Sequence, residues 1–223
     1  IIFAAVVALP IFYAISRGRK QKIFEICRFS HIKPVTVIIL VVAGIGLNLF
    51  NGYALDFIKR ISLFNDAFEN YEGLIKPLLG GNFILVLVGL GIVAPFIEEI
   101  MFRGLILNEL KKVMPVTVAV MLQGVIFGVY HFQLIQGSYA VLLGILFGVA
   151  YIWTKSIWAP IVIHVIINTT STVLSRLPED STLISALDKY EYLFFGISAL
   201  VVLGTFTYLS RNKVDSEKEL LNT

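Results

Sequence analysis

Long stretches of apolar residues recur along the whole chain and limit what it can fold into. Clusters of charged residues, proline or glycine separate these stretches, which cover residues 1–16, 35–57, 82–112, 115–135, 139–153, 157–175 and 191–210. A helix needs about 20 mainly apolar residues to cross the hydrocarbon core of a membrane. Hydrophobic residues make up 57% of the chain and charged residues only 15%, which leaves too little polar surface to cover a soluble core. We therefore predict an all-α, polytopic transmembrane helical bundle of about seven spans.

The same composition excludes other classes of protein. A chain of 223 residues with this many spans has little room for a separate soluble domain, so nucleic-acid binding is not expected. Its one cysteine, Cys27, cannot form an internal disulfide or a thiolate metal site. Residues 59–81 mix acidic with aromatic side chains, as an amphipathic segment at the membrane surface does. We divide the chain into N-terminal spans with this interfacial segment (1–81), a central group of spans (82–175), and a last span with a charged tail (176–223).

Basic residues gather on one side of this map. Because successive spans alternate in direction, 13 of the 18 lysines and arginines fall at one end of the bundle and 5 at the other. The larger group includes the run RGRKQK at 17–22. Basic loops are retained in the cytoplasm during membrane insertion. The sequence therefore predicts a multi-pass protein of the cell membrane whose basic loops are cytoplasmic.

Four ionisable side chains lie inside the predicted spans, where each costs about 2.5–3.5 kcal/mol or more. They are Glu98, Glu99, His131 and His164. Glu99 and Arg103 are four residues apart, so they can form a structural ion pair along one face of a helix. Glu98 is then left without a cation on its own face, which makes it a candidate general base.

Three further spacings connect these residues with polar or aromatic neighbours. His164 and Asn168 are four residues apart, so the imidazole and the amide point to the same side of one helix. Phe127 lies one turn before His131 and is expected to hold its ring. Taken singly, each polar residue could merely hydrogen-bond to a neighbouring helix. Their occurrence together favours one shared site in an intramembrane polar cavity.

These motifs, in this order, resemble the CPBP family of intramembrane proteases. EEIMFRG at 98–104 matches the family pattern EExxxR, FGVYH at 127–131 matches FxxxH, and HVIIN at 164–168 matches HxxxN. The family includes the eukaryotic CAAX prenyl endopeptidases and bacterial abortive-infection and bacteriocin-processing or immunity-linked membrane proteins. The resemblance covers about residues 82–175 and implies that this segment is a catalytic core.

The resemblance also implies roles for the residues. Glu98 and His131 would activate a water for attack on a peptide bond, while His164 and Asn168 would bind the water or stabilise the oxyanion. Glu99, Arg103 and Phe127 would support them. The substrate would be a membrane-associated peptide or protein, cleaved near the cytoplasmic half of the bilayer in a cavity open to the cytoplasm or sideways to lipid.

Two questions stay open at this point. Glu98, His131 and His164 could instead hold zinc, whose bound water is more acidic, which would make the enzyme a metalloprotease rather than a glutamate-dependent one. The fold could also serve as a non-cleaving membrane protein that binds a bacteriocin and confers immunity. An ion-coupled transporter is a third candidate function, since buried ionisable residues mark ion pathways, although the chain has no convincing internal repeat.

Overall fold

The computed structural model describes residues 10, 12–14, 17–18 and 22–214. These residues form helices joined by turns, with no strand among them. In chain order the helices are α2 (Ile23–Ile26), α3 (Pro34–Lys59), η1 (Ser62–Phe64), α4 (Asn65–Leu79), α5 (Phe83–Val86), η2 (Leu87–Val93), α6 (Ala94–Glu99), η3 (Ile100–Leu107), α7 (Asn108–Val113), α8 (Val116–Tyr130), α9 (Leu134–Thr154), α10 (Trp158–Leu174), α11 (Thr182–Lys189) and α12 (Glu191–Arg211).

Four of these helical stretches are long and apolar enough to cross a membrane: α3, the continuous run from α5 to α7, α9 and α12. The apolar helices α8 and α10 are shorter, at 15 and 17 residues. The predicted all-α membrane bundle is confirmed, and six of its seven predicted spans appear as apolar helices. The other predicted span, residues 1–16, lies largely outside the described residues.

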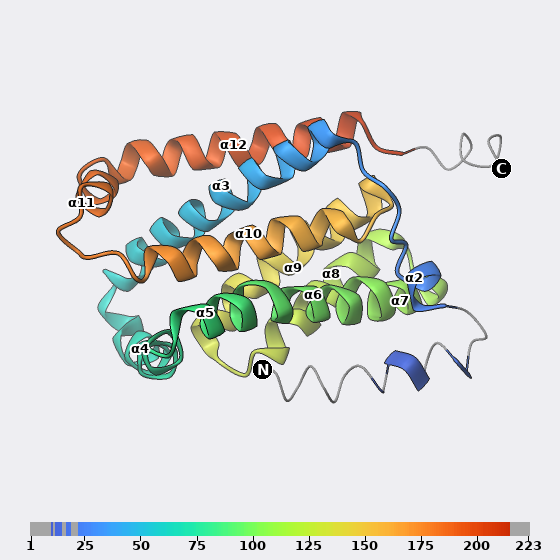
Figure 1. The fold of residues 1–223 in the computed structure, drawn as a ribbon, viewed down its shortest axis with the longest axis horizontal. Helices are drawn as coiled ribbons and strands as arrows, with labels where there is room; N and C mark the ends of the chain where they lie inside the picture. The colour runs from blue at the N-terminus through green and yellow to red at the C-terminus, as the bar shows by residue number, and fades with distance from the viewer. Residues whose placement is uncertain (1–9, 11, 15–16, 19–21, 215–223) are drawn as a thin grey trace.

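The helices pack around α10. Helix α3 lies between α12 and α10, while α10 also contacts η2, α6 and α9. Helices α8 and α9 form an antiparallel hairpin that packs against η3. Figure 1 shows α4 and α11 at one end of the molecule, and α2, the end of α7 and the C-terminal end of α12 at the other.

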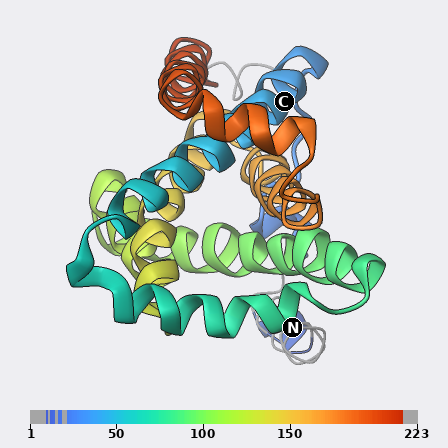
Figure 2. The ribbon, with the colours of Figure 1, turned by 90° about the vertical axis from the view of Figure 1, so that its left-hand side faces the viewer.

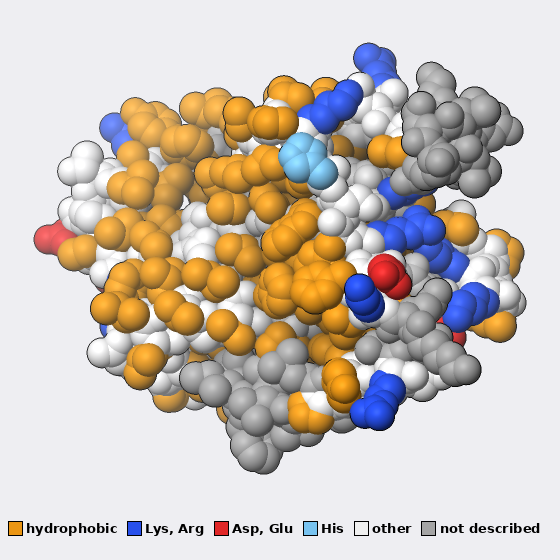
Figure 3. Space-filling model, turned by 45° about the vertical axis from the view of Figure 1, so that its right-hand side comes forward, with side chains coloured by type: hydrophobic (Ala, Val, Ile, Leu, Met, Phe, Trp, Pro, Cys, Tyr) orange, Lys and Arg blue, Asp and Glu red, His pale blue; other side chains and the backbone are white. Residues whose placement is uncertain are grey.

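The two ends differ in charge. We call the end with α2 and the α7–α8 and α9–α10 turns the basic end, because it carries Arg17, Lys22, Arg28, Lys33, Lys111, Lys112, Lys155, Arg211 and Lys213. Many of its blue side chains are visible in Figure 3. The opposite end, which we call the α4 end, carries five basic residues and eight acidic ones, Asp56, Asp66, Glu69, Glu72, Glu179, Asp180, Asp188 and Glu191.

Helix α4 crosses the end of the bundle. It is seen along its axis in Figure 1 and from the side in Figure 2, so it runs across the direction of α10 and α12. Tyr71 on α4 shares a hydrogen bond of 3.1 Å with Tyr139 on α9. At the C-terminal end of α4, Arg176 donates to the carbonyl oxygens of Leu79 and Gly81. These contacts hold α4 over the bundle.

One predicted helix boundary is wrong. The sequence suggests a break at Gly137 and Ser138, but α8 ends at Tyr130 and α9 begins at Leu134. The chain turns there because Phe132 adopts a left-handed conformation, with φ of 51°, and the Gln133 side chain accepts the backbone N–H of Gln136. Gly137 lies inside α9, where a Cβ would come within 3.0 Å of the Gly128 carbonyl oxygen. This glycine therefore allows α8 and α9 to approach each other.

Candidate active site

Two adjacent carboxylates at the end of α6 face the same imidazole on α10. The Oε1 atom of Glu99 lies 2.8 Å from Nδ1 of His164, and Oε2 of Glu98 lies 3.8 Å from Nε2 of the same ring. A carboxylate oxygen can only accept when it is ionised, so Nδ1 of His164 donates to Glu99. This bond fixes the orientation of the ring and directs its other nitrogen towards Glu98.

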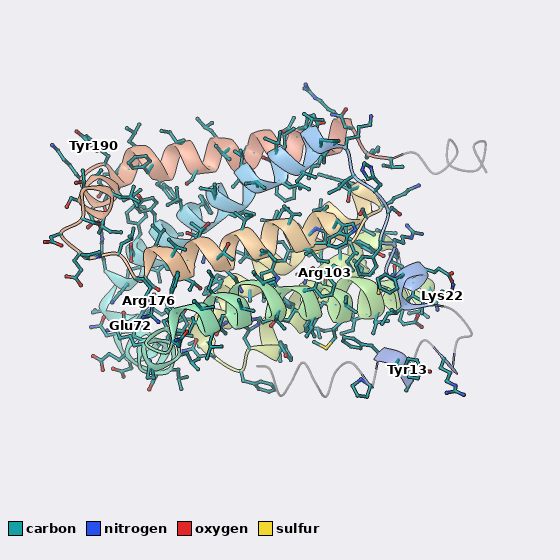
Figure 4. All side chains as sticks on the ribbon, in the orientation of Figure 1. Tyr13, Lys22, Glu72, Arg103, Arg176 and Tyr190 are labelled. Atoms are coloured by element: carbon teal, nitrogen blue, oxygen red, sulfur yellow. The ribbon has the colours of Figure 1, made fainter. Side chains whose placement is uncertain are left out.

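Glu99 also belongs to a buried ion pair. The Nη1 atom of Arg103 donates to Oε1 of Glu99 over 2.9 Å, and both side chains are fully buried. The Nη2 atom of Arg103 donates to the Gly144 carbonyl oxygen over 3.0 Å, and the guanidinium lies 4.5 Å from the ring centre of Phe127 and 5.0 Å from that of Phe147. Figure 4 shows Arg103 well inside the bundle, between the α4 end and the basic end. The pair therefore connects η3 with the α8–α9 hairpin.

His131 lies at the C-terminal end of α8. Its Nδ1 atom is 2.8 Å from the Phe127 carbonyl oxygen, so Nδ1 carries the proton and Nε2 is left to accept one. The Phe127 ring meets the His131 ring edge to face at 4.9 Å and the His164 ring at 5.9 Å. Phe127 thus separates the two imidazoles while contacting both. Among the described residues, no hydrogen bond or ion pair joins His131 to Glu98.

Asn168 reaches the site through an irregularity in the facing helix. The backbone N–H of Ala94 donates to the Gly89 carbonyl oxygen, five residues earlier in the chain, so η2 has π-helical turns, which are wider than those of an α-helix. In this register the Leu90 carbonyl oxygen would accept from residue 95, which is proline and has no N–H. The Nδ2 atom of Asn168 donates to that carbonyl oxygen over 3.0 Å. Wide turns flank α6 on its other side as well, in η3, and such turns are frequent at functional sites.

A cavity of about 590 Å³ joins these groups. Glu98, Phe127, His131, His164 and Asn168 all line it, whereas Glu99 and Arg103 lie behind its wall. Its other lining residues come from α3, α4, η2, α6, η3, α8, α9, α10 and the turn after α8, and they are Asn48, Asn51, Tyr71, Ile75, Leu78, Leu79, Leu90, Ala94, Ile97, Met101, Tyr130, Phe132, Gln136, Tyr139, Ala140, Leu143, Ile167, Ser171 and Thr172.

The cavity lies on the side of the carboxylates that faces the α4 end. On α10 its lining begins at His164 and continues to Thr172, and on α8 it begins only at Phe127. The cavity therefore runs away from the loops that are predicted to be cytoplasmic, and the expectation that it opens to the cytoplasm or sideways to lipid stays a prediction. Helices α8, α9 and η3 pack against one another on the basic side of the site, whereas α4 lines the cavity at the other end.

Sequence reasoning missed two contacts in this site. It assigned Glu99 to Arg103 alone, but Glu99 also orients His164, which lies 65 residues away in the chain. It treated Asn168 only as a partner of His164, but this amide also bonds to Leu90. Pro95 is the sequence signal for the second contact. Proline has no backbone N–H, so it cannot donate to the Leu90 carbonyl oxygen, which is five residues earlier in the chain.

The zinc alternative for Glu98, His131 and His164 stays a prediction. Among the described residues, no group of three or more His, Cys, Asp or Glu side chains is placed to hold a metal ion. The Nδ1 atoms of both histidines are engaged, with Phe127 and with Glu99, which leaves their Nε2 atoms for other partners.

Comparison with known proteins points to one family. Residues 80–170 match the type II CAAX prenyl endopeptidase Rce1-like family. The chain is 33% identical over 94 residues to the "Putative membrane peptidase YdiL" of Bacillus subtilis (strain 168). This alignment covers 42% of this chain and 38% of that protein. It is 28% identical over 111 residues to the "Membrane-embedded CAAX protease MroQ" of Staphylococcus aureus (strain USA300). This second alignment covers 46% of this chain and 44% of that protein.

The chain thus aligns with less than half the length of these curated relatives. No solved structure matches it. The matched segment contains every candidate site residue, from Glu98 to Asn168. The resemblance predicted from the three motifs is confirmed: residues 80–170 carry the sequence pattern of the Rce1-like CAAX prenyl endopeptidase family.

Proposed function

We propose that this chain is an intramembrane peptidase that hydrolyses a peptide bond with a water activated by Glu98. The observation that carries the proposal is the position of His164, held by Glu99 at one ring nitrogen and facing Glu98 at the other, at the wall of a cavity. The similarity to a family of endopeptidases and to two membrane peptidases supports the same reaction class.

The separation of Glu98 from His164 suits a bound water. At 3.8 Å the two atoms are too far apart for a direct hydrogen bond, but a single water can bond to both. Glu98 would take a proton from this water as it attacks the peptide carbonyl carbon, and would then pass the proton to the departing amine. His131, whose Nε2 atom is free to accept, would share in activating the water.

Negative charge then develops on the carbonyl oxygen and needs hydrogen-bond donors. His164 can supply one from Nε2 in the form of its ring that carries a proton on both nitrogens, while Nδ1 still donates to Glu99. Asn168 supplies another, because its amide has a second N–H besides the one that bonds to Leu90. The ion pair of Glu99 with Arg103 would hold His164 in place without entering the cavity.

The cavity wall limits the substrate. Among the described residues that line it, Glu98 is the one acidic side chain, and no lysine or arginine is present. Away from Glu98 and His164, a charged substrate group would lose its hydration without gaining an ionic partner. We therefore propose that the segment around the cleaved bond is uncharged and belongs to a membrane-associated peptide or protein.

Cleavage of membrane-anchored peptides by the purified protein in liposomes tests this proposal. Peptides with an uncharged segment, with and without a prenylated C-terminal cysteine, would be compared by mass spectrometry. Glu98→Gln, which keeps the size of the side chain, should slow cleavage by about 10²-fold or more. Glu69→Gln makes the same change at an exposed position of α4 and should leave the rate unchanged. Full activity in a folded Glu98→Gln variant would overturn the assignment.

A further inference from the structure

We propose that substrate reaches this site from the α4 end of the bundle, and that this end faces away from the cytoplasm. The inference rests on the proposed peptidase function, since it names the face of the membrane from which the peptidase takes its substrate. It is carried by two observations that are independent of the chemistry: the direction in which the cavity runs, and the distribution of charge between the two ends.

The cavity runs from the carboxylates in one direction only. Beyond His164 it is lined by α10 as far as Thr172, near the end of that helix. On α9 it is lined by residues between Gln136 and Leu143, which belong to the first half of the helix. These segments all lie between the site and the α4 end, so the cavity extends from Glu98 towards α4.

The opposite direction is closed by packing. Cys27 lies against Gly104, where a Cβ would meet both Sγ and Cβ of the cysteine. Around this contact, apolar side chains from α8, α9, α10, η3 and the α9–α10 turn form a core whose buried members include Leu105, Leu107, Ala119, Val120, Tyr151, Ile157 and Ile161. A peptide could not reach Glu98 from the basic end without unpacking this core.

The α4 end has an opening with exposed side chains. Phe132 lines the cavity and is 90% exposed, and Leu78, Tyr130 and Ser171 line it and are also exposed. Helix α4 covers this opening and is held by the hydrogen bond between Tyr71 and Tyr139 and by Arg176. A peptide lying at the membrane surface would therefore enter beside α4.

The charge distribution assigns this opening to a face of the membrane. The α4 end has five lysines and arginines against eight acidic residues, whereas the described part of the basic end has nine basic residues against two acidic ones, Glu25 and Glu109. In Figure 4, Lys22 marks the basic end, while Glu72, Arg176 and Tyr190 mark the other. Because basic loops stay in the cytoplasm, the cavity opens on the extracytoplasmic face.

Cysteine accessibility tests this inference in intact cells. The chain has one cysteine, Cys27, which is fully buried, and burial raises the pKa of its thiol to about 12. It should therefore not react with a thiol reagent near neutral pH. Any labelling of a variant can then be attributed to its engineered cysteine. The reagent is a charged maleimide that does not cross membranes.

The engineered positions are a matched pair and one cavity position. Phe132→Cys and Val113→Cys replace exposed apolar residues, 90% and 79% exposed, which lie just after the end of α8 and at the end of α7, just before α8. Ser171→Cys places a thiol in the cavity wall. We expect the cysteines at 132 and 171 to be labelled in intact protoplasts, and the cysteine at 113 only after the membrane is permeabilised.

Labelling of the cysteine at 113 in intact cells, or failure to label those at 132 and 171 until permeabilisation, would overturn the inference. Because labelling requires no catalysis, its outcome is separate from that of the cleavage assay. A chain that cleaves peptides but shows the reversed labelling pattern would keep its proposed function and lose this direction of entry.

Discussion

Removing Arg103 should destabilise the protein by more than the ion pair itself contributes. In an Arg103→Met variant, Glu99 would remain fully buried without the guanidinium and would keep only its hydrogen bond from His164. Removing one partner of a buried pair costs about 3–5 kcal/mol. The variant also loses the hydrogen bond to Gly144 and the contacts of the guanidinium with Phe127 and Phe147. We expect its free energy of unfolding to fall by about 4 kcal/mol, near the middle of that range.

The double variant separates the pair from its surroundings. Glu99→Gln alone leaves Arg103 buried without its carboxylate, whereas Glu99→Gln with Arg103→Met leaves neither charge. The double variant should therefore be more stable than the sum of the two single effects predicts, by about 2–3 kcal/mol of coupling. Unfolding by denaturant in mixed micelles measures all three variants.

Glu72→Gln provides the control for this cycle. Glu72 pairs with Lys59 and Lys76 at the exposed α4 end, so its loss should cost less than about 1 kcal/mol. If the double variant loses the sum of the single effects to within about 0.5 kcal/mol, the two buried charges do not depend on each other. The role assigned here to the ion pair would then be refuted.

Three other predictions concern the packing of the bundle. Gly128→Ala would place a Cβ 2.6 Å from a backbone carbonyl oxygen of α9 and should lower the free energy of unfolding by about 1–3 kcal/mol. Gly196→Ala is the control, because its Cβ would meet nothing within 4 Å, and it should leave stability unchanged. Equal thermal unfolding temperatures for the two variants would contradict the prediction. Tyr139→Phe should cost about 1 kcal/mol by removing the partner of Tyr71, and an unchanged denaturation midpoint would argue against the bond. Because its thiolate is scarce below a pH of about 12, Cys27 should be alkylated at pH 8 only after unfolding, and labelling of the folded protein would refute its burial.

Local spacing was enough to predict much of the candidate site. Residues three or four apart on a helix share a face whatever surrounds them, so the ion pair of Glu99 with Arg103 and the contact of Phe127 with His131 could be expected from the sequence. Five residues of the three motifs, Glu98, Phe127, His131, His164 and Asn168, line one cavity, although their chemical roles stay predictions until the cleavage assay is done.

Contacts between distant segments could not be predicted in this way. Nothing in the spacing indicates that Glu99 would bond to His164, because their distance depends on how α6 and α10 are placed relative to each other. The regular helix assumed for residues 82–112 also hid the wide turns of η2, and with them the free carbonyl of Leu90 to which Asn168 bonds.

The sequence by itself determined that this chain is a bundle of membrane helices with polar groups at fixed places along them, because hydropathy and helical spacing are properties of single segments. Only the tertiary structure decided which of those groups meet and towards which end their cavity runs. The reason is that side-chain packing between helices, such as the close approach of Gly128 to Gly137 and of Gly104 to Cys27, sets where the bundle is closed and where it stays open.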